Sequence, residues 1–312
     1  MEGIDGRIKL GNFKNKAAQE YPDFNLYLNL LLNMMGKIDF NLNWLLGTDY
    51  TQPMNFLFIA LLLFSGIFIR YLILAMIYHE LVYKKIGDYQ PHRRLHQQIK
   101  IPQVKKEIWY SFLGAVIFAI SGTLLIIFWQ KGNTKLYTDL KVMDLLWMPG
   151  SFFLSLFIHE TYYYWLHRWM HRPKVLRHFH HIHHNSLYTS SFTSFSFHPI
   201  EAIFQAVFLP VLVLFLPMHF TVLLALLVTM SITAVINHAG VEIYSSSAIQ
   251  SPIARWMVGA THHDLHHLKY RCNYGLYFTF WDVWMRTEDA GFEKRFLEHT
   301  SKKNVDKIKS NS

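Results

Sequence analysis

The stretch that decides the fold is HETYYYWLHRWMHRPKVLRHFHHIHHNSLYTSSFTSFSFHP, residues 159–199, which holds nine of the chain's 19 histidines. Its densest parts are His167-x-x-x-His171 and His180-x-x-His183-His184. Far downstream, HHDLHH at residues 262–267 repeats the HxxHH spacing. Histidines three or four residues apart place two imidazoles on one helical face, and imidazole is the commonest protein metal ligand. These patterns predict one metal site built from distant segments.

The composition indicates a membrane protein. Of the 312 residues, 52% are hydrophobic and 16% are aromatic, which is too apolar for an ordinary soluble enzyme of this length. The net charge of +9 would also suit nucleic acid, but Lys and Arg fall between apolar stretches and form no single reading face. The single cysteine, Cys272, excludes an intramolecular disulfide and a cysteine-based metal site.

Apolar stretches predict an all-α fold, a multi-pass membrane helical bundle. A helix of about 20 apolar residues crosses the hydrocarbon core, and the stretches that fit are 53–78, 109–130, 143–165, 200–216 and 220–236. Within the first of them, Arg70 must snorkel or pair. Residues 24–46 are interrupted by Lys37 and Asp39, so we expect a short or interfacial helix there.

Basic residues between positions 84 and 106 predict the orientation of the bundle. Seven Lys and Arg crowd this loop, and the positive-inside rule places such a loop in the cytoplasm. With five alternating spans, every histidine cluster then lies in a cytoplasmic, histidine-rich, metal-binding cap. The predicted organisation is a partly interfacial N-terminal segment (1–52), the first transmembrane helices with the basic loop (53–142), a catalytic domain (143–290) and a solvated, polar, basic tail (291–312).

The spacing selects nine candidate metal ligands, all but His238 also expected to be catalytic: His167, His171, His180, His183, His184, His238, His263, His266 and His267. Nine nitrogens are too many for one tetrahedral zinc ion, so two metal ions are implied. Imidazole suits iron, zinc or copper better than magnesium or calcium. Neutral imidazoles leave the metal charge uncompensated, so hydroxide, oxide or an outer carboxylate must balance it.

Several flanking residues are expected to support these ligands, because imidazole N–H groups are usually oriented by a hydrogen-bonding partner. They are Glu160, His198, Glu242, His262, Asp264 and Asp282. Glu201 also flanks the clusters and could orient an imidazole N–H group. For Glu201 and Glu242, ordinary surface charge is an alternative explanation.

Beyond ligand spacing, the sequence resembles the fatty acid hydroxylase/sterol desaturase superfamily. The resemblance rests on HRxxH at 167–171, HxxHH at 180–184, FHPIE at 197–201, HxxHH at 263–267 and NYGxYFTxWD at 273–282. It extends from near Arg93 to near Thr287, and the 273–282 run is most similar to sterol C5-desaturases, or lathosterol oxidases. Phe195 stands where the family has histidine, and Glu160 where it has aspartate. These departures bear on the substrate and not on the superfamily.

The resemblance implies a membrane-bound di-iron oxidase that uses O₂ and two electrons to desaturate a sterol or sterol-like lipid. Fatty acyl or alkyl hydroxylation is the alternative within the same superfamily. The cofactors implied are two iron ions, with zinc possible in purified protein, and O₂ as cosubstrate. The membrane would be the endoplasmic reticulum in a eukaryote or the inner membrane in a bacterium. Residues 162–165, Phe192 and Phe195 can line the lipid's access path, or belong to the core and the interfacial belt.

The electron source must be a separate protein, because the sequence has no glycine-rich dinucleotide motif. A cytochrome b5-like or ferredoxin-like donor is expected, and Lys84 to Lys106 can steer an acidic partner, although positive-inside topology explains the same charges. A histidine-rich metal transporter is the alternative of a different class. It predicts ionisable ligands at bilayer depth, yet 56–68 and 115–128 contain none. A bis-histidine haem protein would need lone histidines on facing helices, and no nucleic-acid partner is expected.

Overall fold

The computed structural model describes residues 45, 47–96, 99–140 and 142–301. The chain divides into two units, Met1–Thr48 with Asp139–Leu146, and Asp49–Thr138 with Trp147–Ser312. All nine candidate ligands belong to the second unit. The helix expected at 24–46 falls outside the described residues, apart from Leu45, and so does the end of the predicted tail.

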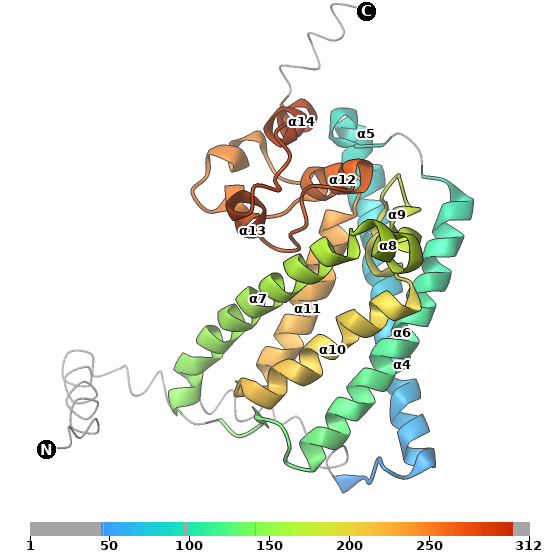
Figure 1. The fold of residues 1–312 in the computed structure, drawn as a ribbon, viewed down its shortest axis with the longest axis vertical. Coiled ribbons are helices and arrows are strands. Elements are labelled where there is room, and N and C mark those ends of the chain that lie inside the picture. Colours follow the sequence, from blue (N-terminus) through green and yellow to red (C-terminus); the bar gives the residue numbers. More distant parts are fainter. Residues whose placement is uncertain (1–44, 46, 97–98, 141, 302–312) are drawn as a thin grey trace, which may run out of the picture. The chain divides into compact units, whose positions relative to one another are not determined.

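The described residues are mainly helical, as predicted (Figure 1). The long helices are α4 (Pro53–Tyr78), α6 (Ile101–Gln130), α7 (Val142–Met170), α10 (Pro199–Phe215) and α11 (Phe220–Asn237). Shorter helices are α5 (Gly87–Tyr89), α8 (Pro173–Val175), α9 (His181–His184), α12 (Ala260–Lys269), α13 (Phe280–Trp284) and α14 (Phe292–Thr300). Segments of π-helix, His79–Ile86 (η1) and Leu176–His180 (η3), continue α4 and precede α9.

Short 3₁₀ turns and one small sheet complete the described structure. The turns are Pro91–Arg93 (η2), Ser191–Phe195 (η4), Ser246–Gln250 (η5) and Ala254–Trp256 (η6). Strands β1 (Leu136–Tyr137) and β2 (Met218–His219) pair in parallel, with Leu136 opposite Met218. They tie the connection after α6 to the connection between α10 and α11.

Local sequence explains where the long helices begin. Proline occupies the first turn of α4, α6 and α10, where its missing N–H costs no hydrogen bond. The side chains of His198 and His219 cap α10 and α11 by accepting the backbone N–H of Ile200 and Thr221, each at 3.2 Å. His198 therefore serves as a helix cap and does not orient a candidate ligand.

Among the residues that the structure describes, three helices are long and apolar enough to cross a membrane by length and composition: Pro53–Tyr89, Ile101–Gln130 and Phe220–Asn237. At 17 residues α10 is apolar but shorter. The expected span at 143–165 lies within α7 but is not among the three. Its Asp144, His159 and Glu160 break the apolar run. Hydropathy thus supports three of the five expected crossings.

Buried apolar side chains from α7, α10 and α11 form the main core, together with Leu276 and Tyr277 from the loop after α12. By contrast, α4 exposes large apolar side chains such as Leu57 (51%) and Phe58 (60%). An exposed apolar face of this extent on a long helix suits contact with lipid. A buried carboxylate joins α6 to η4: Glu107 of α6 accepts hydrogen bonds from Ser190 and Thr193.

The C-terminal elements pack against the histidine-bearing end of the unit (Figure 1). In α14, Phe296 is buried, and Arg295 bonds Asp264 of α12 at 2.7 Å. The expectation of a solvated tail from residue 291 is therefore wrong for α14. The polar sequence after Trp284 concealed an amphipathic helix whose apolar face is covered.

Candidate metal centre

Four segments bring the nine candidate ligands together. His167 and His171 lie one turn apart at the end of α7. His180 ends η3, and His183 and His184 lie in α9. His238 directly follows α11, and α12 supplies His263, His266 and His267. The i,i+3 and i,i+4 spacing aligns the rings within each helix, and the fold brings the helices together.

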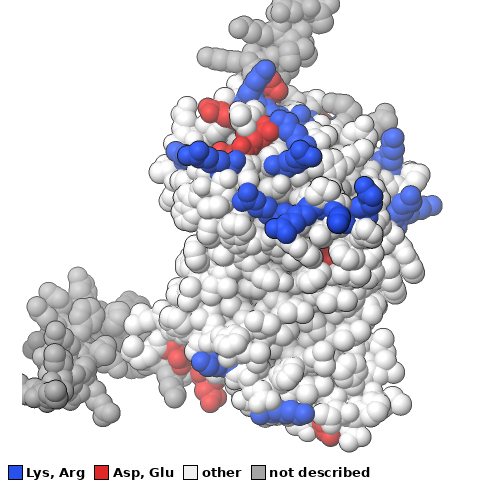
Figure 2. Space-filling view, viewed as in Figure 1, with Lys and Arg blue, Asp and Glu red and all other residues white. Residues whose placement is uncertain are grey.

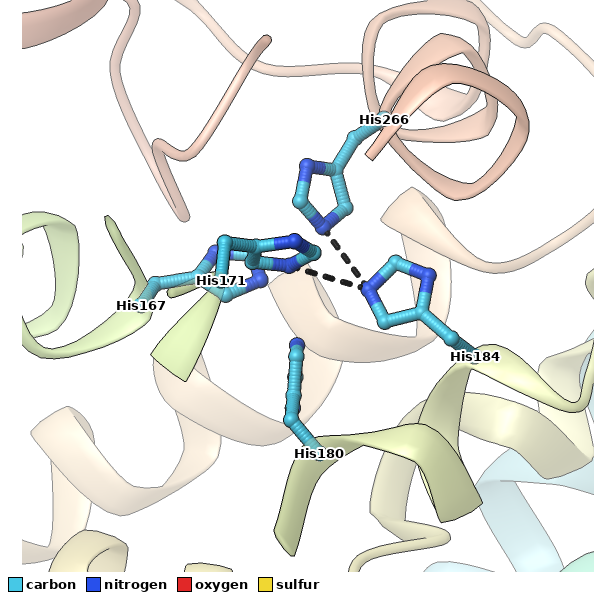
Figure 3. Close-up of side chains that lie close together, drawn as sticks. All are labelled: His167, His171, His180, His184 and His266. Carbon is cyan, nitrogen blue, oxygen red and sulfur yellow. Dashed lines mark hydrogen bonds between the residues drawn. The ribbon is translucent and has the colours of Figure 1, made fainter. Parts of the chain in front are cut away.

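The nine ligands form two groups, in each of which the candidate donor atoms all lie within 4.8 Å of one another. The first group is His167, His171, His180, His184 and His266. The second group is His183, His238, His263 and His267. Figure 3 shows the five rings of the first group turned toward a shared centre. This division matches the two ions implied by the ligand count.

The separations between ring nitrogens fit metal coordination. In the first group, His184 Nε2 lies 3.1 Å from Nε2 of both His171 and His266. In the second, His238 Nε2 lies 3.2 Å from His183 Nε2 and 2.9 Å from His263 Nε2. Two nitrogens about 2.1 Å from one ion and at right angles to each other would be about 3.0 Å apart. Such a cluster of neutral imidazoles suits a shared cation better than mutual hydrogen bonds.

Backbone carbonyls fix the orientation of four of the rings. The Nδ1 atoms of His167, His266, His183 and His238 lie 2.9, 2.7, 3.3 and 2.7 Å from the carbonyl oxygens of Tyr274, Cys272, Ser196 and Ala234. A carbonyl oxygen only accepts, so each Nδ1 carries the proton. Each Nε2 is then a free lone pair directed into its group, the arrangement a metal requires.

Burial keeps the imidazoles neutral. It lowers the pKa of His238 to about 4 and holds the pKa values of His183, His263 and His267 well below the usual range. Burial likewise depresses the pKa of His266. Only unprotonated imidazole binds a metal, so these nitrogens can act as ligands at neutral pH. His171 is the one candidate ligand that is only partly buried.

Glu201, one of the acids that flank the histidine clusters in the sequence, lies beside a candidate ligand. Its Oε1 lies 2.9 Å from Nδ1 of His180, and both side chains are 1% exposed. It follows the helix cap in the run Phe197-His198-Pro199-Ile200-Glu201, and it faces inward because α10 starts at Pro199. The sequence offered surface charge as an alternative for Glu201. A buried acid beside a candidate ligand can balance part of the metal charge.

Two of the predicted supporting acids, Glu160 and Asp282, hold a loop instead of an imidazole. Glu160 accepts the backbone N–H groups of Leu276, Tyr277 and Phe278 at 3.1, 2.6 and 3.2 Å. Asp282 accepts those of Tyr274 and Gly275 at 2.9 and 2.8 Å. The same loop presents the Tyr274 carbonyl to His167, so both acids support a ligand through the backbone.

The other predicted supporting residues organise α12. Glu242 accepts the backbone N–H of Thr261, in the first turn of that helix, at 2.9 Å. Asp264 pairs with His96 and Arg295. His262 is buried against Phe292 with its ring centroid 5.1 Å away. Asp264 and His262 contact these partners instead of the candidate ligands because α12 places successive residues on different faces.

An apolar cavity of about 220 Å³ reaches the second group. It lies between α4, α6, α7, α10 and α11, and His238, Phe197 and Leu276 line it near the histidines. Of the aromatic residues expected along the lipid's path, Tyr163 and Phe195 line the cavity. Its volume exceeds the engineered apolar cavity of about 150 Å³ that binds benzene, so it can hold part of a lipid.

A basic groove opens on the first group. Its walls carry Arg168, Arg172, Arg177, Lys269 and Arg271, and its lining includes His171. Tyr270, held at φ 66°, places its ring centroid 4.6 Å from that of His184. Figure 2 shows a row of Lys and Arg crossing this end of the molecule above a face almost without charge. No described residue of the predicted basic loop at 84–106 lines this groove, so the groove is a separate basic surface.

The fold and the site define a mainly helical protein with membrane-type helices and two histidine groups suited to metal ions. Residues 152–287 match the protein-family model described as fatty acid hydroxylase. The predicted resemblance to this family is therefore confirmed over residues 152–287.

Known relatives extend the comparison. The Delta(7)-sterol 5(6)-desaturase ERG3B of Gibberella zeae is 29% identical over 192 residues, 61% of this chain and 58% of that protein. The lathosterol oxidase of Homo sapiens is 29% identical over 189 residues, 60% of this chain and 62% of that protein. The matches thus span about three-fifths of these relatives' length. No solved structure matches the chain significantly.

Proposed function

We propose that this chain is a membrane-bound di-iron oxidase that desaturates a sterol or sterol-like lipid. The observation that carries the proposal is the convergence of nine imidazoles in two groups beside an apolar cavity. The names of the relatives, sterol desaturase and lathosterol oxidase, support the substrate class. The balanced reaction is CH₂–CH₂ + O₂ + 2 e⁻ + 2 H⁺ → CH=CH + 2 H₂O.

The metal pair, when bound, would supply reduction of O₂ and hydrogen removal from an unactivated carbon, which no side chain achieves alone. The chain's own residues do the positioning. Carbonyl contacts at Nδ1 turn His167, His183, His238 and His266 so that each Nε2 would be available to hold an ion. Glu201 would place negative charge beside His180 once a cation is bound there. Apolar walls exclude water and set which carbon of the lipid lies closest to His238.

Fatty acyl or alkyl hydroxylation is the second candidate, and the description of the matching family model favours it. Both reactions begin with removal of one hydrogen. They diverge when either a second hydrogen is removed or oxygen is transferred to carbon. A metal transporter is disfavoured, because α4 carries only Arg70 and α11 no charged residue or histidine between its ends.

Electrons are proposed to arrive at the basic groove from a cytochrome b5-like or ferredoxin-like protein. Arg172, Arg177 and Arg271 are exposed there, and the groove includes His171, the partly buried ligand. An acidic carrier would be attracted to these charges. The basic loop Lys84–Lys106, which the sequence suggested for docking, carries no candidate ligand and serves as the rival surface.

The membrane and its sidedness follow as proposals from charge and hydropathy. The positive-inside rule places the basic groove, the loop at 84–106 and the metal centre in the cytoplasm. In a eukaryote the membrane would be the endoplasmic reticulum, and in a bacterium the inner membrane.

Lipid profiling of cells with and without the gene tests the function. Loss of a sterol double bond would support desaturation, and loss of a hydroxylated chain would support the alternative. The variants His183→Ala and His266→Ala should each lose bound metal and lipid oxidation together. Normal lipid oxidation by a variant that has lost its metal would refute the proposal.

A further inference from the structure

Two sets of polar side chains that line the apolar cavity differ in their hydrogen bonding. Ser121, Ser194 and Ser231 line it, and their hydroxyls donate to the carbonyls of Ala206, Ser191 and Leu227 at 2.8 Å each. His159, Gln205 and Arg70 also line it. His159 Nε2, Gln205 Nε2 and Arg70 Nε are buried without a partner among the described residues. The serines need no ligand, whereas the other three side chains have unused hydrogen-bonding capacity.

Contacts within the protein hold the His159 ring in place, so that its unpaired nitrogen can bind a ligand. It is 1% exposed, and its Nδ1 lies 2.6 Å from the Tyr277 hydroxyl. Its ring centroid lies 4.3 Å from that of Phe208, which is three residues after Gln205 on α10. His159 and Gln205 thus meet the same part of the cavity wall. A fixed imidazole with a free second nitrogen can bind a ligand without first reorganising.

Arg70 adds a positive charge to the same cavity. It is the only charged residue in α4, and no acidic residue lines the cavity with it. A buried polar group without a partner costs free energy, and an unpaired cation costs more. Ionisable residues inside apolar spans usually mark a functional site. Arg and Gln bring N–H donors, so the ligand must bring acceptor oxygens.

We propose that His159, Gln205 and Arg70 form a polar anchor that binds a hydroxyl or carboxylate oxygen of the lipid substrate. The proposal rests on the lipid oxidase function and names the chemical group that the cavity recognises. A lipid with an oxygen at one end would be oriented by this anchor. Its hydrocarbon part would then extend along the apolar wall toward His238. A pure hydrocarbon would leave the anchor unpaired and would bind less tightly.

Binding to the purified, metal-loaded protein tests the anchor without turnover. The probes are two matched pairs, 5α-cholestan-3β-ol with 5α-cholestane and octadecanoic acid with octadecane. Within at least one pair, the oxygenated lipid should raise the melting temperature more than its hydrocarbon. The pair with the larger difference distinguishes a sterol hydroxyl from an acyl carboxylate. Equal shifts within both pairs would overturn the proposal.

The variants Gln205→Leu and Arg70→Met separate a binding role from a structural one. Each should weaken binding of the oxygenated probe about tenfold, the effect of losing one strong hydrogen bond, and leave hydrocarbon binding unchanged. Each should also raise the melting temperature of the ligand-free protein, because an unpaired buried donor disappears. A lower ligand-free melting temperature with unchanged probe binding would mean a structural role and overturn the proposal.

Ser121→Ala is the matched control. It removes a cavity-lining hydroxyl that is already satisfied by Ala206, so preference for the oxygenated probe should persist. An equal loss of preference in Ser121→Ala would overturn the assignment of the anchor. If the anchor behaves as expected but no lipid is oxidised in cells, the proposed function fails and the anchor stands. If lipid is oxidised in cells but the variants do not change binding of the oxygenated probe, the proposed function is supported and the anchor is refuted.

Discussion

Replacing Glu160 by alanine tests how the metal centre is supported from outside. The carboxylate accepts three backbone N–H groups from Leu276, Tyr277 and Phe278, and it is fully buried. Glu160→Ala leaves those donors unpaired. At about 1–2 kcal/mol for each orphaned group, the loss is about 3–6 kcal/mol. For a unit of this size each kcal/mol corresponds to about 2–4 °C, so the melting temperature should fall by about 6–24 °C.

The substitution should also weaken metal binding, because the loop that Glu160 holds presents the Tyr274 carbonyl to His167. Glu160→Gln keeps one acceptor oxygen and should lie between alanine and wild type in both properties. Thr161→Val, which removes a hydroxyl contact with Trp281 at 3.1 Å, is the neighbouring control and should cost about 1 kcal/mol or less. Thermal melting and metal analysis measure both effects. A Glu160→Ala protein with wild-type melting temperature and metal content would refute the reasoning.

Three further predictions concern the metal and its surroundings. Purified protein should hold about two transition-metal ions per chain. The variants His171→Ala and His238→Ala should each lose about one ion, because the two residues belong to different histidine groups. Elemental analysis that finds no metal loss in either variant would contradict this prediction. Metal-free protein should lose stability as the pH falls from about 6.5 toward 4. Burial lowers the pKa of His238 in the folded protein to about 4, so over this interval the unfolded chain binds the proton more readily than the folded protein does. A melting temperature that rises as the pH falls would contradict this prediction. The triple variant Arg172→Glu/Arg177→Glu/Arg271→Glu should bind the haem domain of a cytochrome b5 about tenfold more weakly at low salt. The matched variant Lys85→Glu/Lys105→Glu/Lys106→Glu should change this affinity little. If titration calorimetry finds the larger loss of affinity in the lysine variant, the donor binds the loop and not the groove.

The ligands could be predicted from the sequence because their signal is local. A helix fixes the relation of His263 to His266 and His267, and of His167 to His171, whatever the rest of the chain does. His238 has no such partner in the sequence, but its place at the end of an apolar stretch put it near the other clusters. The structure brings all nine together, and the division into two groups came only from the fold.

The supporting contacts could not be predicted, because they depend on loops that no periodic pattern describes. Glu160 and Asp282 were expected to contact imidazoles, yet both bind the backbone of residues 274–278. Gly275 makes this possible, because a Cβ there would collide with the Phe278 carbonyl oxygen and crowd both carboxylates. The carbonyls of Cys272 and Ser196 orient ligands although carbonyls have no sequence signature. The contact of Glu201 with His180 could be predicted only by knowing where α10 begins and which side of that helix faces inward.

The two openings of the centre give each histidine group a different neighbour. The apolar cavity reaches His238 of the second group, and the basic groove reaches His171 of the first. A lipid and a charged electron carrier cannot share one approach, since the first needs low polarity and the second needs solvated charge. Because His183 and His184 are adjacent in α9 but belong to different groups, one turn of helix couples the two sides. Under the proposed function, an electron delivered at the groove would have a short protein path to the side where the lipid would be held.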